Sequence, residues 1–277
     1  MQLFAQNCWI FAVFIGWTAL VLPLGWCCVL VWRGLGWRGG TDAIRIGSYC
    51  YARALWLLLS PVLPVHTTNA TEAQRHAPCV IVANHQSFLD LFLFGMQANS
   101  NFCYLSKSWP YRKLFFFAPI MRYAEYVDVE ALAPEQAEEQ CRRLLKKGVS
   151  LVIFPEGRRT RDGTLGAFHS GAFRIACAAN VPVVPLVIAN SGAVFPVGGK
   201  HFTPQPLRLE LKPALFPRDF TAASLPHRAL MRAVREVFVR ALQPTNLEVT
   251  HAQNTPSSGS GPHGRAGGHR LPQGRPH

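Results

Sequence analysis

The stretch Cys79-Val80-Ile81-Val82-Ala83-Asn84-His85-Gln86-Ser87-Phe88-Leu89-Asp90 decides the fold that this sequence predicts. Its first five residues have the length and the β-branched content of a buried strand. His85 therefore lies where a strand meets a loop, and α/β proteins collect ligands and catalytic groups at such strand ends. If residues 87–90 start a helix, Asp90 lies about one turn beyond His85 and can accept a hydrogen bond from its ring.

The His85 and Asp90 pair has two interpretations. In the first, His85 is a general base and Asp90 is the carboxylate that orients it. In the second, His85 caps a helix and Asp90 complements the helix dipole from the first turn. The rest of the sequence has to decide between them.

After Pro78, apolar stretches alternate with helix-like stretches. The expected strands are 79–83, 101–106, 126–129, 149–154, 181–188 and 207–211. The expected helices are 87–96, 111–123, 134–147 and 227–243, and 166–179 is expected to be a loop followed by a helix. This alternation predicts an α/β fold with a mixed, largely parallel sheet flanked by helices. Because Pro182 and Pro185 interrupt one strand, that strand is expected at an edge or with a bulge.

The composition favours a membrane protein that meets an anionic partner. Charged residues make up 16% and hydrophobic residues 49% of the chain, whereas soluble domains carry about 25% charged residues. The formal net charge of +13 then indicates anionic lipid or nucleic acid. Lipid is preferred and nucleic acid is not expected, because the Cys and His spacings of zinc fingers are absent.

The eight cysteines contain no C-x-x-C pair, and several lie in apolar runs. They are expected to be small buried hydrophobes in a reducing compartment. Neither a metal site nor a disulfide framework is expected.

The N-terminal stretch Cys8–Trp32 carries no charge and exceeds the roughly 20 residues that a membrane-spanning helix needs. No Lys or Arg precedes it and no small-residue cleavage site follows, so a retained anchor is preferred to a signal peptide. Arg33, Arg38 and Arg45 follow directly, which places that side in the cytoplasm. A re-entrant hairpin broken at Pro23 and Gly25 is the alternative.

Three regions are expected along the chain. Residues 1–65 are membrane-anchoring helices, and the apolar run Ala54–Val65 in them is an interfacial or core-packed helix. Residues 66–243 form the globular domain, which opens with a polar connection over 66–77. Residues 244–277 are a Gly, Pro and His-rich tail, which is expected to be disordered.

The loop Pro155-Glu156-Gly157-Arg158-Arg159-Thr160-Arg161 follows an apolar strand. Glycine lets a backbone approach a ligand, and guanidinium groups match phosphate oxygens, so the loop suits an anion. Solvated surface arginines are the simpler interpretation. If the strands are parallel, however, this loop leaves the sheet on the same side as His85.

The stretch Tyr111–Tyr123 is both aromatic and basic. It contains three consecutive phenylalanines, residues 115–117, beside Arg112, Lys113 and Arg122. A packed helix with a solvated basic edge is one interpretation, and contact with a membrane interface is the other.

Together these motifs resemble those of the glycerolipid acyltransferase superfamily, which is typified by 1-acylglycerol-3-phosphate acyltransferases. The resemblance rests on Asn84–Asp90, Phe154–Thr160, Phe168–Ala172 and the proline-containing strand 181–188, and it covers about residues 66–215. It implies a membrane-bound enzyme that moves a fatty acyl chain from a thioester donor to a lysophospholipid hydroxyl. The acceptor implied first is 1-acylglycerol-3-phosphate, which gives phosphatidic acid.

The resemblance also implies roles for individual residues. His85 would be the general base and Asp90 its orienting partner, while Ser87 would take no part. The acceptor would be bound by residues of the second motif and one lysine, namely Phe154, Pro155, Glu156, Gly157, Arg159 and Lys107. Val129 stands where the family usually has an arginine, so one charge-assisted contact to the phosphate is absent, and Arg122 and Arg158 are the candidates to replace it.

The partners follow from the same resemblance, and the location follows from the N-terminal anchor and the arginines after it. The co-substrate would be acyl-CoA or acyl carrier protein, with no cofactor and no metal. The enzyme would lie in the inner membrane with its catalytic domain on the cytoplasmic side, among membrane lipids. Transfer to another lysolipid, such as an amino-acid lipid, is one alternative. A catalytically dead membrane lipid-binding protein is the other.

Overall fold

The computed structural model describes residues 1–37, 39–161 and 163–243, and Met1–Leu242 form one compact unit. Its sheet has seven strands in the order β1-β7-β6-β2-β5-β3-β4. Neighbouring strands are parallel except β6 and β7, which are antiparallel. The strands are β1 (Val65–Thr68), β2 (Val80–Ala83), β3 (Phe102–Ser106), β4 (Val127–Asp128), β5 (Ser150–Ile153), β6 (Val183–Ala189) and β7 (Leu207–Leu211). The predicted α/β fold with a mixed, largely parallel sheet is confirmed.

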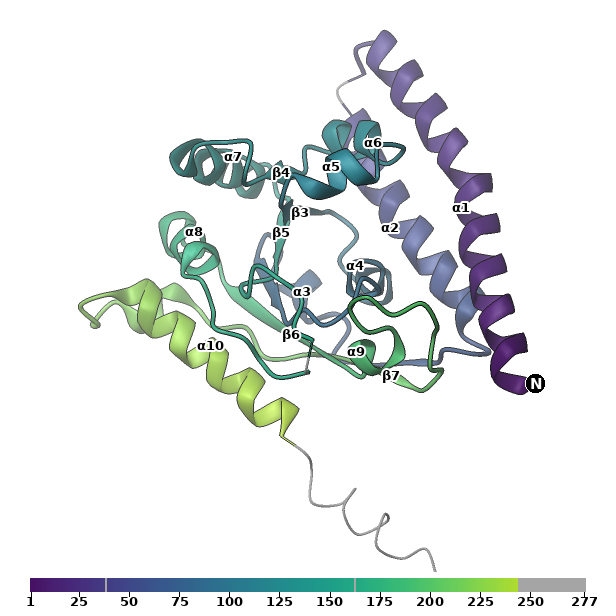
Figure 1. Cartoon of the computed structure of the whole chain (residues 1–277). Helices are drawn as coiled ribbons and strands as arrows, with labels where there is room; N and C mark the ends of the chain where they lie inside the picture. Colours follow the sequence, from purple (N-terminus) through teal and green to yellow (C-terminus); the bar gives the residue numbers. More distant parts are fainter. Residues whose placement is uncertain (38, 162, 244–277) are drawn as a thin grey trace, which may run out of the picture. The chain divides into compact units, whose positions relative to one another are not determined.

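Helices cover both faces of this sheet (Figure 1). One layer contains α1 (Gln2–Gly34), α2 (Gly40–Leu59), α4 (Asp90–Leu93) and η1 (Phe94–Met96). The other contains α7 (Pro134–Lys146), α8 (Gly171–Ala179) and α10 (Pro226–Leu242). The remaining helices are α3 (Glu72–Arg75), α5 (Trp109–Lys113), α6 (Ala118–Tyr123), α9 (Ser191–Val194) and η2 (Pro217–Phe220).

The central strand β2 shows why its sequence is apolar throughout. Ile81 and Ala83 belong to the hydrophobic cluster beneath α2 and α4, whereas Val80 and Val82 belong to the cluster beneath α7, α8 and α10. Successive side chains of a strand point to opposite faces, and here both faces are covered. The strand therefore carries no polar alternation.

Two predicted helices and one predicted connection differ from the structure. The helix expected over 87–96 begins only at Asp90, because the three residues before it form a loop around the Asp90 carboxylate. The stretch 111–123 is divided by a turn at 114–117 into α5 and α6. The connection expected at 66–77 contains part of β1 and all of α3, and β1 pairs with β7 at the sheet edge.

The edge position predicted for the proline-containing strand is wrong, because β6 lies between β7 and β2. The alternative, a bulge, is confirmed: the register shifts by one residue between the Leu186–Leu211 pair and the Val183–Leu215 bridge. The carbonyl of Pro185 accepts from the Lys212 N–H at 2.9 Å, just past the end of β7. The missing N–H of Pro185 thus faces that end and not β2.

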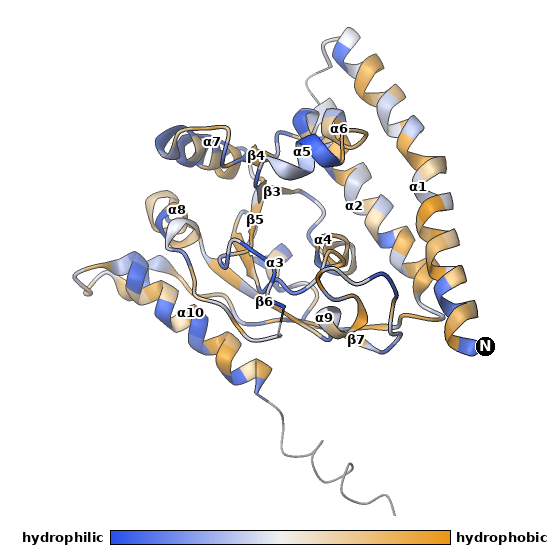
Figure 2. Ribbon diagram, in the orientation of Figure 1, coloured by the Kyte–Doolittle hydropathy of each residue, from blue (hydrophilic) through white to orange (hydrophobic). Residues whose placement is uncertain are grey.

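The N-terminal helix α1 passes Pro23 without a break, so the hairpin predicted as an alternative is absent from it. By length and composition it is one helix that could cross a membrane. Most of α1 has the colour of hydrophobic residues in Figure 2, and Ile15, Leu20 and Leu30 are more than 60% exposed. On its inner side, Trp17 Nε1 donates to the Tyr51 carbonyl of α2 at 3.1 Å.

The second helix is longer than predicted. It begins at Gly40 and not near Ala54, and it packs against the core through Leu55, Trp56 and Leu59. The run Ala54–Val65 was predicted to be either an interfacial or a core-packed helix, and the core-packed interpretation is confirmed. The division of the chain at residue 65 stays a prediction, and the tail 244–277 lies outside the described residues.

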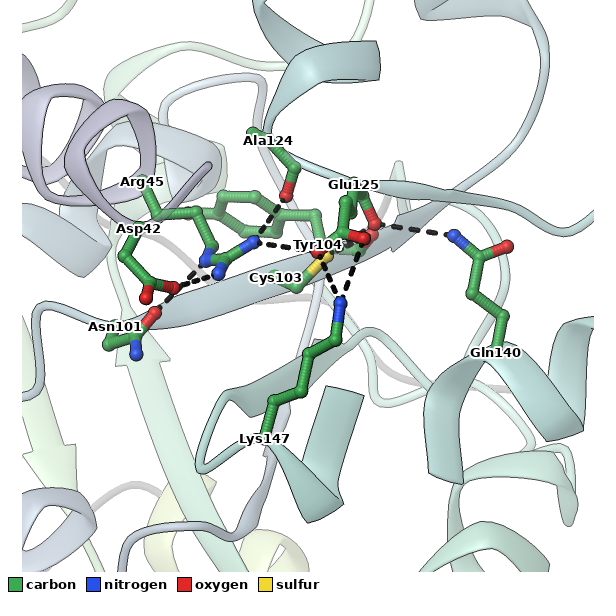
Figure 3. A network of polar contacts seen from close by, with 9 residues as sticks. All are labelled: Asp42, Arg45, Asn101, Cys103, Tyr104, Ala124, Glu125, Gln140 and Lys147. Carbon is green, nitrogen blue, oxygen red and sulfur yellow. Dashed lines mark hydrogen bonds and ion pairs between the residues drawn. The ribbon is translucent and has the colours of Figure 1, made fainter. Parts of the chain in front are cut away.

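A buried arginine fixes α2 to the sheet (Figure 3). Arg45 is 2% exposed and donates to Asn101 Oδ1 at 3.0 Å, to the Ala124 carbonyl at 2.9 Å and to Glu125 at 3.4 Å, and it also pairs with Asp42. The prediction used Arg45 as one of the positive charges that place the segment after the N-terminal helix in the cytoplasm. For Arg45 this prediction is wrong. Its charge is compensated inside the protein.

The prediction that the cysteines are buried hydrophobes holds only in part. All eight are free thiols, but Cys8, Cys27 and Cys50 are exposed. Burial raises the pKa of the Cys79 and Cys141 thiols to about 12, so both stay protonated at neutral pH. These two are inert core residues.

Candidate functional site

The site forms where two neighbouring parallel strands end. His85 lies two residues after the end of β2, and Phe154 directly follows the end of β5. The His85 imidazole stacks on the Phe154 ring with centroids 4.1 Å apart and planes 23° apart. The prediction that both loops leave the sheet on one side is confirmed.

Asp90 holds the imidazole of His85. Its Oδ2 lies 2.9 Å from His85 Nδ1 and also accepts from the backbone N–H groups of Gln86 at 2.8 Å and Ser87 at 2.9 Å. Asp90 is fully buried. Because an ionised carboxylate only accepts hydrogen bonds, Nδ1 carries the proton and Nε2 is left as the acceptor. Asp90 is also the first residue of α4, but its bond to His85 favours the general-base interpretation.

Two amides on either side of His85 fix the end of β2. Asn84 donates from Nδ2 to the Ile188 carbonyl and accepts from the Ile188 N–H, both at 2.8 Å. Gln86 Nε2 donates to the Gly163 carbonyl at 3.0 Å. The Asn84 pair reproduces a strand ladder between β2 and β6 and keeps the His85 backbone in place.

Glu156 reaches the backbone of His85 and not the open cavity. Its Oε1 accepts from the His85 N–H and its Oε2 from the Gly166 N–H, each at 2.8 Å. The residue is 5% exposed, and burial raises the pKa of its carboxyl while these two hydrogen bonds lower it. A Cβ at Gly166 would lie 2.8 Å from Oε2, so only glycine allows this close approach.

The rest of the Glu156 loop clasps the same backbone. The Thr160 N–H donates to the His85 carbonyl at 2.9 Å, so both polar groups of the His85 peptide are held by this loop. Gly157 has φ +65°, a conformation that favours glycine, and an added Cβ would lie 3.3 Å from the His169 ring. The Pro155 carbonyl accepts from the His169 N–H at 2.8 Å.

A cavity of about 890 Å³ opens beside His85. Its volume is in the range of sites for small organic ligands. Apolar residues of α1 and α2 and the rings of Phe88, Phe92 and Tyr104 line one part. Charged side chains line another: four are cationic, namely Lys107, Arg158, Arg159 and Arg174, and Glu138 is anionic. Such a cavity suits an amphiphile with an apolar chain and an anionic group.

Most of the predicted site residues meet at this cavity. Phe154, Pro155, Gly157 and Arg159 line it with His85, as does half-exposed Lys107, whose Nζ lies 3.9 Å from Glu130. Val129 also lines it, so the position where an arginine was expected does face the ligand space. Of the two candidate replacements, Arg158 lines the cavity, whereas Arg122 is not among its lining residues.

Sequence reasoning missed several polar residues at the cavity, among them His169 and Arg174. His169 packs over Gly157, and Arg174 on α8 pairs with Glu138 at 3.4 Å. The motif Phe168–Ala172 pointed to His169 as part of the site. For Arg174 the signal was its position one turn after Gly171, at the start of α8.

Other chemistries find less support. The Ser87 hydroxyl donates to the Phe195 carbonyl at 2.7 Å and is buried, so Ser87 is not the nucleophile of a Ser-His-Asp arrangement. Over residues 1–37, 39–161 and 163–243, no group of three or more His, Cys, Asp or Glu side chains could hold a metal ion.

Comparison with known proteins finds a family model and several relatives to which this chain is similar. Residues 64–189 match the family model described as Acyltransferase. A chloroplastic 1-acyl-sn-glycerol-3-phosphate acyltransferase of Brassica napus is 32% identical over 170 residues, which are 57% of this chain and 47% of that protein. The human 1-acyl-sn-glycerol-3-phosphate acyltransferase beta is 29% identical over 197 residues, 68% of this chain and 67% of that one. The chain spans about half the length of the plant relatives it matches.

A solved structure shares the fold. The crystal structure of the 1-acyl-sn-glycerophosphate acyltransferase PlsC from Thermotoga maritima aligns with a TM-score of 0.68 at 21% sequence identity. The alignment covers 92% of this chain and 99% of that chain, so the similarity extends beyond the residues that the family model matches.

Proposed function

Because the chain belongs to the glycerolipid acyltransferase superfamily, we propose that it is a membrane-bound O-acyltransferase. It moves a fatty acyl chain from a thioester donor to the hydroxyl of a lysophospholipid, and 1-acylglycerol-3-phosphate, which gives phosphatidic acid, is the preferred acceptor. The observation that carries the proposal is the His85–Asp90 pair, bonded at 2.9 Å beside a cavity with an apolar part and a cationic part.

The chemistry is a direct transfer with His85 as general base. Nε2 of His85 takes the proton of the acceptor hydroxyl while that oxygen attacks the thioester carbonyl. The new C–O bond replaces the C–S bond, and the proton goes to the departing thiolate. Asp90 keeps the ring in the required tautomer and stabilises the imidazolium that forms. No acyl-enzyme intermediate is needed.

The acceptor's two ends fit the two parts of the cavity. Its acyl chain takes the apolar part beside α1 and α2, and its phosphate takes the cationic part with Lys107 and Arg159. Arg158 compensates for the arginine that the family usually has at the position of Val129, because Arg158 lines the same cavity. The family resemblance implies that Glu156 binds the acceptor, but in this proposal Glu156 holds the His85 backbone.

The N-terminal helix brings the site to the lipid. Asn7 of α1 donates to the Phe202 carbonyl at 3.0 Å, and Trp26 Nε1 donates to the Phe116 carbonyl at 2.7 Å, so α1 lies along the globular part from end to end. A helix held in this way is better accommodated within one leaflet than across the bilayer. The cytoplasmic leaflet of the inner membrane stays the proposed location, because its anionic lipid attracts a chain with a formal net charge of +13.

A panel of lysolipids, each offered with acyl-CoA and with acyl carrier protein, tests the proposal. Lysophosphatidic acid is expected to give a diacylated product at a rate at least about tenfold above monoacylglycerol, since only the former offers a phosphate to the arginines. Product masses and free thiol are measured together. Preferred acylation of an amino-acid lysolipid would change the proposed acceptor to that lipid. If no pair of donor and acceptor gave thiol release, the result would favour a lipid-binding protein without catalytic activity.

A further inference from the structure

The turn between α5 and α6 exposes an aromatic side chain beside cations. Phe115 is 68% exposed and Trp109 is 38% exposed. Arg112, Lys113 and Arg122 are exposed around them. We call residues 109–117, which are α5 and the turn that follows it, the aromatic turn.

The aromatic turn adjoins the exposed surface of α1. Trp26 of α1 donates from Nε1 to the Phe116 carbonyl of the turn at 2.7 Å. Just before it, a Cβ on Gly25 would lie 3.0 Å from Ile120 of α6, so the two segments are in close contact. Leu24 and Leu30 of α1 are 60% and 68% exposed. Exposed apolar residues of α1 therefore lie close to the turn, and α1 and α6 are neighbours in Figure 1.

The cavity reaches the surface at this junction. Leu24 of α1 and Trp109 of the aromatic turn are exposed and also line the cavity. Leu114, Phe117 and His85 line the same cavity. Phe115 is not among its lining residues. A chain entering between α1 and the turn would thus have a continuous apolar path toward His85.

We propose that the aromatic turn is a second membrane-contacting surface, separate from α1, and that it binds a bilayer containing anionic lipid. Phe115 enters the interface, and Arg112, Lys113 and Arg122 meet lipid phosphates. Aromatic side chains favour the interfacial region, and an anionic bilayer attracts cations that lie near its surface. The cavity mouth then faces the acyl chains, so an acceptor enters from the plane of the membrane. The entry of the acceptor from the membrane rests on the proposed function.

The full-length chain with Phe115→Asp tests the surface. In vesicles of phosphatidylcholine and phosphatidylglycerol, kcat/KM for lysophosphatidic acid is expected to fall about tenfold, because a carboxylate replaces an inserted ring beside anionic lipid. In detergent micelles it should stay within about twofold of wild type, since Phe115 does not line the cavity. The matched control is Leu225→Asp, at a residue 45% exposed between η2 and α10, and it should change neither rate.

Two rate outcomes would overturn the proposal. If Phe115→Asp kept wild-type activity in vesicles, the turn would not contact lipid. A protein partner would then explain why Phe115 is exposed. An equal loss in micelles would mean that Phe115 supports the fold or the site.

A readout without activity separates this surface from the proposed function. Vesicles that contain a lipid with a photoreactive acyl chain should label peptides covering 112–117 and leave the peptide around Leu225 unlabelled. Labelling of α1 alone would overturn the proposal even if the chain is an acyltransferase. Labelling of the turn in a chain without transferase activity would support the surface and reject the enzyme.

Discussion

Replacing His85 with alanine is expected to lower kcat about 10²- to 10⁴-fold, the usual contribution of a general base. The reason is geometric. Asp90 Oδ2 accepts a hydrogen bond from the Nδ1–H of His85 at 2.9 Å, and Nε2 is the only basic group that this pair offers to an acceptor hydroxyl. Alanine leaves the cavity and its cations in place, so KM for the lysolipid should change little.

The measurement is the initial rate of free thiol release with saturating thioester and lysophosphatidic acid in vesicles. His76→Ala is the matched control, because that partly buried histidine pairs with Glu72 on α3 and does not line the cavity. It should retain nearly full activity. A His85→Ala rate above about a tenth of wild type would remove His85 from the role of base.

Replacing Glu156 with glutamine is expected to lower kcat by about 10- to 100-fold and to leave KM for the acceptor within a few-fold of wild type. The two oxygens of Glu156 accept from the N–H groups of His85 and Gly166, each at 2.8 Å. Glutamine has one acceptor oxygen, so its NH₂ group would face a second donor. A buried N–H without a partner costs about 1–3 kcal/mol, and the His85 backbone shifts to avoid that cost.

The separation of kcat from KM distinguishes the two roles of Glu156. If this carboxylate bound the glycerol part of the acceptor, as the family resemblance implies, KM for lysophosphatidic acid would rise more than kcat falls. Glu139→Gln is the control, since Glu139 is exposed on α7 and pairs with Arg142. Thermal unfolding of both variants shows whether the Glu156 substitution acts through global stability.

The strand ends and the His85–Asp90 pair were predictable because their signals are local. Apolar runs of strand length locate β2 and β5, and parallel neighbours bring the residues after them to one edge. His85, Phe154 and Arg159 accordingly meet at one cavity. The start of the helix at Asp90 was misplaced because three donors around one carboxylate, His85 Nδ1 and two backbone N–H groups, form a loop that local spacing cannot distinguish from a helical turn.

The features that the sequence did not reveal depend on partners far along the chain. Glu156 bonds a backbone N–H 71 positions away, and nothing in its own motif indicates that partner. Arg45 seemed a surface charge by its place after an apolar helix, yet groups 56 to 80 positions away compensate its charge inside the protein. Pro185 is tolerated in an interior strand because its missing N–H faces the bulge beyond β7.

The most direct test of the central claim follows two products at once in the purified full-length chain. Vesicles containing lysophosphatidic acid receive an acyl thioester, and free thiol and phosphatidic acid are measured against time for wild type and His85→Ala. The proposed function predicts equal molar amounts of thiol and phosphatidic acid from wild type, and at least about 100-fold less of both from the variant. Thiol release without phosphatidic acid, or equal product from His85→Ala, would contradict it.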